Sequence, residues 1–316
     1  MPALPDLIVH ADWGSDSKKR QMCVAQKGSS GTFHLGAPEP VGELDTFWQR
    51  IHQRAGSKRV LAGFDFPIGV PATYAKAAGI ADFRLALNSF GEGKWATFYD
   101  VARSKEDISI HQPFYPNVPD RTTKQSHLLE GLGVTDISQL LRRCEQASQS
   151  LRAASPLFWT VGSKQVGKAA IIGWRDIIVP GMQAEHFDLK IWPFDGNLHG
   201  LLGSDASVVV ETYPAAACVQ LGLDAPGQGT WKKGDSHDLR RLANRILEWP
   251  DSLEISFSNA LVHEIKAGFE QGDDAFDAAI GLFGMLDVVL GDRNTGVPDD
   301  DTVRGMEGWI FGRQMN

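Results

Sequence analysis

Cysteine is scarce in this chain of 316 residues, which contains only Cys23, Cys144 and Cys218. Three well-separated cysteines cannot form a disulfide framework, and their spacing fits no cysteine-type zinc site. The sequence also has no apolar run approaching the roughly 18 residues that a membrane span needs, and its first residues lack the features of a signal peptide. We therefore expect a cytoplasmic protein with reduced thiols and no membrane partner.

A basic excess is missing as well, because the formal net charge is −8 at pH 7. Proteins that bind nucleic acid through nonspecific electrostatics usually carry a positive surface. Short basic clusters occur at 18–20, 142–143, 232–233 and 240–241, but such clusters are more often solvated faces than phosphate tracks. Any contact with nucleic acid should therefore be local.

The pattern of apolar residues predicts an α/β protein. Hydrophobic residues make up 42% of the chain and charged residues 22%, which is typical of a globular protein with a substantial core. Apolar runs at 7–14, 22–26 and 32–35 are separated by turn-forming segments, so we expect three antiparallel strands. A helix with apolar spacing follows at 41–54, and a buried strand at 60–65 should lie parallel to the first strand.

The remainder divides into an insertion and the second part of the core. Residues 71–204 have a looser pattern and predict a mostly helical insertion or cap, with one helix expected at 137–149 and a short strand at 188–192. Strong strand character resumes at 206–214. The helices expected after it are at 236–248, 257–271 and 274–290. The expected core therefore comprises residues 1–70 and 205–316.

Carboxylates stand at the ends of three expected strands and on one late helix. Asp12, Asp65 and Glu211 each close an apolar run, while Asp274 and Asp277 share one helical edge at i, i+3. In an open α/β sheet, ligands bind at the carboxyl ends of the strands, so these acids can converge. Carboxylates within about 4 Å of one another repel unless a divalent cation lies between them, and oxygen ligands suit Mg²⁺ or Mn²⁺.

Each acid taken alone also has an ordinary structural interpretation. Asp274 can be a first-turn acid that the helix dipole favours. Asp65, just ahead of Pro67, can bond the amides of a turn, and Glu211 can precede a helix that begins at Pro214. The three acidic strand ends taken together nevertheless favour a functional cluster.

Several of these segments resemble a known family. The order of strands and helices, with its acids, resembles the RNase H-like fold of nucleases and resolvases. More narrowly, the chain is similar to the family called domain of unknown function 429, whose members are predicted RNase H-fold nucleases. The segments that carry this similarity are 12–14, 64–69, 211–216, 274–277 and 307–310.

The resemblance implies a fold and a set of metal ligands. The fold would be an RNase H-like mixed sheet, with three antiparallel strands followed by parallel strands, flanked by helices. The implied catalytic metal ligands are Asp12, Asp65, Glu211 and Asp277, with Asp274 as a further ligand. The insertion at 71–204 is larger than the basic fold needs, so the resemblance implies no particular substrate.

Basic residues for substrate phosphates are expected outside the acidic group. The segment 162–168 has the G-x-x-x-x-G-K spacing of a phosphate loop, but Ala169 stands where a Ser or Thr would hold Mg²⁺, so we expect no true phosphate loop. The residues that could meet substrate phosphates, or simply form a solvated face, are Lys18, Arg121, Lys164, Lys168 and Arg175.

The leading hypothesis is phosphodiester hydrolysis dependent on Mg²⁺ or Mn²⁺, by a nuclease whose insertion forms one wall of the cleft. The second is an ATP-dependent phosphotransferase of the actin-like and sugar-kinase fold, with residues 12–15 as a phosphate loop. That class should have a second glycine-rich loop, which is not evident. The third is a noncatalytic binding module that keeps the fold.

Overall fold

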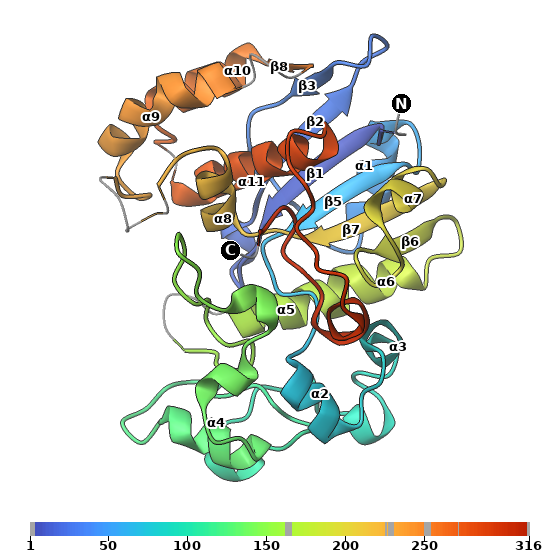
Figure 1. Ribbon diagram of the computed structural model, residues 1–316, viewed down its shortest axis with the longest axis vertical. Helices are drawn as coiled ribbons and strands as arrows, with labels where there is room; N and C mark the ends of the chain where they lie inside the picture. The colour runs from blue at the N-terminus through green and yellow to red at the C-terminus, as the bar shows by residue number, and fades with distance from the viewer. Residues whose placement is uncertain are drawn as a thin grey trace.

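A mixed sheet of eight strands forms the centre of the molecule, in the order β6-β7-β5-β1-β2-β3-β8 with β4 beside β2 (Figure 1). The computed structural model describes residues 4–161, 166–224, 226, 231–249, 254–270 and 272–314. The strands are β1 (Leu7–Asp12), β2 (Gln21–Lys27), β3 (Phe33–Leu35), β4 (Glu39–Pro40), β5 (Val60–Phe64), β6 (Asp188–Ile191), β7 (Ala206–Glu211) and β8 (Ile255–Phe257). Both halves of the chain therefore contribute to one sheet.

The pairing of the strands follows the predicted pattern. β1, β2 and β3 pair antiparallel in hairpin order. β5 and β7 lie parallel on the other side of β1, with Ala11 beside Phe64 and Gly63 beside Val210. The prediction of three antiparallel strands followed by parallel strands is confirmed. Because parallel neighbours end at the same edge, the carboxyl ends of β1, β5 and β7 come together.

Helices cover both faces of the sheet. The α-helices are α1 (Phe47–Ala55), α2 (Ala72–Ala78), α3 (Phe83–Leu87), α4 (Gln125–Leu132), α5 (Val166–Gly173), α6 (Val179–Met182), α7 (Leu198–Leu202), α8 (Pro214–Gln220), α9 (Ser236–Glu248), α10 (Asn259–Ala267) and α11 (Asp273–Val289). The 3-10 helices are η1 (Ser17–Lys19), η2 (Gly93–Trp95), η3 (Lys105–Asp107), η4 (Ile137–Leu140) and η5 (Arg143–Glu145), and the π-helical segments are η6 (Trp174–Ile178) and η8 (Val303–Glu307). α11 packs on β1 and β2 (Figure 1). No helix in the described ranges is long and apolar enough to cross a membrane.

The side chains of the strands alternate between the two faces of the sheet, so the core consists of two main clusters, one on each face. Val9 of β1 and Val209 of β7 belong to the cluster that α1 and the helix from α5 to α6 cover. Ile8 of β1 and Val210 of β7 belong to the cluster that α11 covers. Because successive side chains of a strand point to opposite faces, this alternation decides which face each residue at a strand end can reach.

Part of the segment predicted as an insertion belongs to the core. In Figure 1, α2, α3 and α4 lie below the sheet, as an insertion would. However, β6 pairs parallel with β7 as the edge strand of the main sheet. The helix from α5 to α6 also packs against the core, where Ile177 O accepts a hydrogen bond from Trp48 Nε1 at 3.0 Å. The core sheet and its helical layer therefore extend into the range 71–204.

The prediction of a helix at 137–149 is wrong. The segment contains the separate 3-10 turns η4 and η5, with the extended residues Leu141 and Arg142 between them. The apolar spacing that suggested a helix is explained by the inward positions of Leu140 and Cys144, both fully buried. The break also carries the Arg142 side chain into the interior, where no part of it is exposed.

Candidate metal centre

The alternation of side chains along β1 and β5 directs Asp12 and Asp65 toward α11. Asp12 lies four residues after Ile8 on β1, and residues an even number of positions apart on a strand point to the same face. Asp12 therefore lies on the face that α11 covers. Asp65 follows β5 one residue after Phe64, whose ring belongs to the opposite cluster. The backbone N of Asp65 donates to Ala11 O at 3.1 Å, which holds the two strand ends side by side. The two carboxylates consequently enter the same space.

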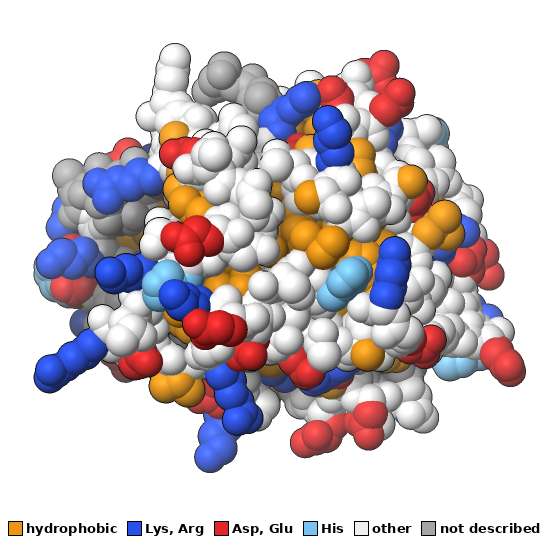
Figure 2. Space-filling model, turned by 90° about the horizontal axis from the view of Figure 1, so that it is seen from below, with side chains coloured by type: hydrophobic (Ala, Val, Ile, Leu, Met, Phe, Trp, Pro, Cys, Tyr) orange, Lys and Arg blue, Asp and Glu red, His pale blue; other side chains and the backbone are white. Residues whose placement is uncertain are grey.

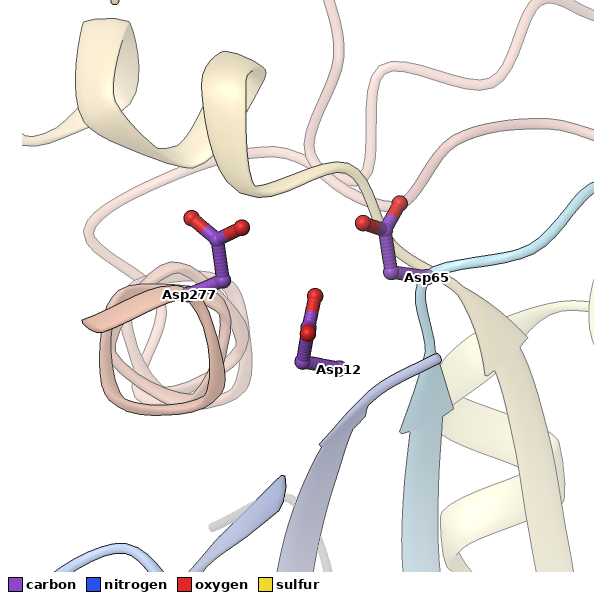
Figure 3. Close-up of side chains that lie close together, drawn as sticks. All are labelled: Asp12, Asp65 and Asp277. Atoms are coloured by element: carbon purple, nitrogen blue, oxygen red, sulfur yellow. The ribbon is translucent and has the colours of Figure 1, made fainter. Parts of the chain in front are cut away.

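Three aspartates meet at this edge of the sheet. Figure 3 shows Asp12 at the end of β1, between Asp277 of α11 and Asp65 after β5. One carboxylate oxygen from each residue lies within 4.8 Å of the other two. Asp277 is buried, with 4% of its surface exposed, and the other two are half-buried. The structure thus brings together Asp12, Asp65 and Asp277 from the five predicted ligands.

Asp274 lies beside this group, one helical turn before Asp277. It is half-buried, and its side chain is hydrogen-bonded to Asp12. Burial raises the pKa of Asp274, and the charge of Asp273 raises it further, while Lys19 and Lys233 oppose the rise. The i, i+3 spacing therefore places both acids on the predicted edge, with Asp277 deeper than Asp274.

The crowding of negative charge acts most strongly on Asp12. Burial raises the pKa of Asp12 to about 8, and the charge of Asp65 is the next largest cause. Asp274 and Asp273 act in the same direction, and Lys233 opposes them. A carboxyl that is buried among other acids is a position at which a bound cation stabilises the folded protein.

One cation from a distant segment already reaches the group. Lys233, which lies between α8 and α9, forms an ion pair with Asp277. The Lys233 side chain is 31% exposed, whereas that of Asp277 is 6% exposed. In the sequence, Lys233 stands out only as part of the basic pair 232–233, and such a pair is more often a solvated face than a functional site. The contact was missed because no local pattern links it to α11.

His10 joins α11 to the sheet directly behind the carboxylates. Its buried imidazole places Nδ1 3.0 Å from Ala278 O and Nε2 2.8 Å from Thr212 Oγ1. Since a carbonyl oxygen only accepts, Nδ1 carries the proton and the Thr212 hydroxyl donates to Nε2. At Gly281 of α11, an added Cβ would lie 2.1 Å from the His10 ring, so this close approach requires glycine.

Glu211 does not join the three aspartates. On β7 it lies two residues after Val209, so both side chains point to the same face, which is the one opposite to α11. Arg142 donates from Nη1 to Oε2 and from Nη2 to Oε1, both at 2.6 Å, and Ile68 N donates to Oε2 at 2.7 Å. Both oxygens are bound in a buried bidentate ion pair, so the structure does not place Glu211 with the three aspartates, as the prediction of a shared metal site expected.

The same ion pair connects three distant segments. Arg142 Nη2 also donates to Glu145 Oε1 at 2.8 Å, and Arg142 Nη1 donates to Glu307 O at 3.0 Å. The Glu307 carboxylate accepts hydrogen bonds from the backbone N of Ala72 and of Arg143, each at 3.1 Å. The segments around Glu211 and Glu307, two of those that carry the family resemblance, therefore meet here to anchor the insertion.

The basic residues predicted to meet substrate phosphates do not form one group. Lys18 and Arg175 line a pocket of about 1170 Å³ beside η1, where Arg175 is paired with the acid that follows it. Lys168 Nζ donates to a backbone carbonyl at 3.0 Å. Arg121 is exposed on the insertion, and Lys164 lies outside the described residues. Among the predicted phosphate-contacting residues, Lys18 and Arg175 line the same cavity.

The lower face of the molecule has no broad basic surface in its described part. Figure 2 shows acidic and basic side chains interspersed over this face, with apolar side chains between them. Such a mixture does not form the continuous positive track that nonspecific nucleic-acid binding uses.

Comparison of the chain with protein-family models, with curated proteins and with solved structures gives no match. The function must therefore be inferred from the geometry and chemistry of the site itself.

Proposed function

We propose that this protein hydrolyses phosphodiester bonds with divalent metal ions, as a nuclease with an RNase H-like core. The observation that carries the proposal is the convergence of Asp12, Asp65 and Asp277 within 4.8 Å. The strand order β3-β2-β1-β5-β7, antiparallel and then parallel, supports the RNase H-like part of the proposal. The proposed membership of the domain of unknown function 429 rests on the short motifs alone, and the ion-paired Glu211 departs from the role that they imply.

The donor set fits Mg²⁺ or Mn²⁺. The ligands available at this edge are carboxylate oxygens, which these hard cations prefer. Within the described residues, no His or Cys joins the group, and a zinc site would usually include one. The raised pKa of Asp12 also fits, because a divalent ion would favour its charged form and release its proton on binding.

The side chains of the site have distinct positions for this chemistry. Asp12 lies between the other two acids, and Asp12, Asp65 and Asp277 together would hold the divalent metal (Figure 3). When bound, divalent ions supply a lowered pKa for the attacking water and charge stabilisation at the leaving oxygen. His10 and Gly281 hold α11 close to β1, so the spacing of Asp12 and Asp277 is maintained.

The proposed substrate is nucleic acid or another phosphodiester, contacted locally around the acids because the net charge is −8. The test is incubation of single-stranded, branched and RNA–DNA hybrid substrates with Mn²⁺, comparing wild type, Asp12→Asn and the exposed control Asp292→Asn. We expect cleavage by wild type and control, and a loss of roughly a hundredfold or more in Asp12→Asn. Equal cleavage by all three proteins would remove Asp12 from the mechanism.

Two other outcomes would favour the alternative functions. Thermal stabilisation by ATP with Mg²⁺, but not by Mn²⁺ alone, would favour a phosphotransferase. Absence of both cleavage and metal-dependent stabilisation would favour a noncatalytic binding module.

A further inference from the structure

Lys233 is held near the acids by its own segment. Two residues before it, Trp231 is buried and packs edge-to-face on Phe276 of α11, with ring centroids 5.7 Å apart. Two residues after it, Asp235 caps α9 by accepting from the backbone N of His237 and Asp238. The backbone on both sides of Lys233 is therefore anchored, and its side chain is directed to Asp277.

The charges around Lys233 explain why it is drawn into the site. Its ammonium pairs with Asp277 and acts favourably on both Asp12 and Asp274. On Asp274, Lys19 acts in the same direction and more strongly than Lys233. Lys233 is consequently a positive charge held directly against the three aspartates through its ion pair with Asp277. Its flexible stem and 31% exposure leave a route by which the ammonium can move out to solvent.

We propose that Lys233 is a built-in counter-ion that occupies the cation position of the site and competes with the divalent metal. The inference rests on the proposed metal-dependent function and concerns the regulation of that same site. A divalent ion bound to Asp277 would lie next to the ammonium, and like charges at that separation repel strongly. The ammonium therefore leaves Asp277 when the metal binds, which weakens the net metal affinity.

Loss of the Lys233 charge should have opposite effects on the metal-free protein and on metal binding. Without metal, loss of the Lys233 charge leaves the acids less compensated and lowers the melting temperature. With metal, loss of the same charge removes a competitor. A partly buried ion pair of ordinary strength corresponds to roughly tenfold in an equilibrium constant, so the Kd for Mn²⁺ should fall by about that factor.

The test is isothermal titration of Mn²⁺ into the full-length wild type, Lys233→Met, Lys233→Arg and Lys232→Met. Lys232 is the matched control, because it is the neighbouring lysine and its side chain is exposed. We expect a Kd about tenfold lower for Lys233→Met, and values near wild type for Lys233→Arg, which keeps the charge, and for Lys232→Met. Circular dichroism of each variant establishes that it is folded before titration.

The outcomes separate this inference from the proposed function. Wild type that binds Mn²⁺, with an unchanged or higher Kd for Lys233→Met, would overturn the counter-ion role and leave the metal site standing. No Mn²⁺ binding by any folded variant would overturn the metal site and the counter-ion role together. A Lys233→Met protein that fails to fold leaves Lys233→Gln as the test, with the same expected direction.

Discussion

Replacement of Asp12 by asparagine should stabilise the metal-free protein. Asp12→Asn keeps the shape of the side chain and removes one negative charge from three carboxylates whose oxygens lie within 4.8 Å of one another. Most substitutions are neutral or destabilising, so a gain in stability at a half-buried position would be informative. We expect this gain in the presence of a chelator at alkaline pH.

The magnitude follows from the spacing of the charges. At 4.8 Å and an effective dielectric constant of about 20, two like charges repel by about 3 kcal/mol. Asp12 faces two such partners, and the attraction of Lys233 offsets part of the repulsion. We expect a net gain of roughly 2 kcal/mol in the free energy of unfolding, which for a chain of this size raises Tm by about 3 °C.

The gain should depend on pH in a defined direction. Asp12 has its pKa raised from 3.8 to about 8 in the folded protein. Between these values the unfolded chain releases a proton that the folded protein keeps, so the contribution of Asp12 to stability falls as pH rises. The variant lacks this contribution. The difference between the two proteins should therefore vanish near pH 4 and be fully present above about pH 8.

Thermal unfolding with EDTA, across this pH range, measures the effect in wild type, Asp12→Asn and Asp292→Asn. Asp292 is exposed, so its substitution controls for a general change of charge. Addition of Mn²⁺ should then raise the Tm of wild type and control but not that of Asp12→Asn. An Asp12→Asn protein that is less stable than wild type at pH 8 would refute the repulsion, and a retained Mn²⁺ shift would refute the ligand role.

Three further predictions concern the scaffold of the site. Arg142→Met should lower the free energy of unfolding by roughly 3–5 kcal/mol because Glu211 remains buried without its partner, and urea unfolding should show that the double variant with Glu211→Met recovers much of the loss. Gly281→Ala should destabilise by roughly 2 kcal/mol through its contact with the His10 ring. Gly14→Ala, where an added Cβ meets nothing within 4 Å, should stay within about 0.5 kcal/mol in the same urea assay. Burial lowers the pKa of His10 to about 4, so stability should fall between about pH 6.5 and 4, and an unchanged pH profile in His10→Gln would contradict that origin.

The sheet was predictable because its signals are local. Turn-forming segments between short apolar runs determine that β1, β2 and β3 pair as hairpins, and the helix before β5 requires a crossover that makes β5 parallel to β1. Asp12 and Asp65 stand at the ends of neighbouring parallel strands, and such ends meet at one edge. Asp277 was predictable from the acidic edge of an otherwise apolar helix.

Glu211 shows where a local pattern is insufficient. Its strand is apolar on both faces, because Val208, Val209 and Val210 are all buried. The sequence of such a strand contains no alternation of polar and apolar residues that would tell which face α11 covers. Adjacent residues here point to opposite faces of the sheet. Thr212 reaches His10 on the side of α11, whereas Glu211 reaches Arg142 on the other side.

By itself, the sequence determined the strands β1, β2, β3, β5 and β7, their pairing and the positions of three acids at one edge, because each depends on neighbours along the chain or on a repeating pattern. Tertiary structure alone decided that Arg142 neutralises Glu211, that β6 completes the sheet and that Lys233 pairs with Asp277. These contacts join residues far apart in the chain. Their energies depend on burial and distance, which exist only once the chain has folded.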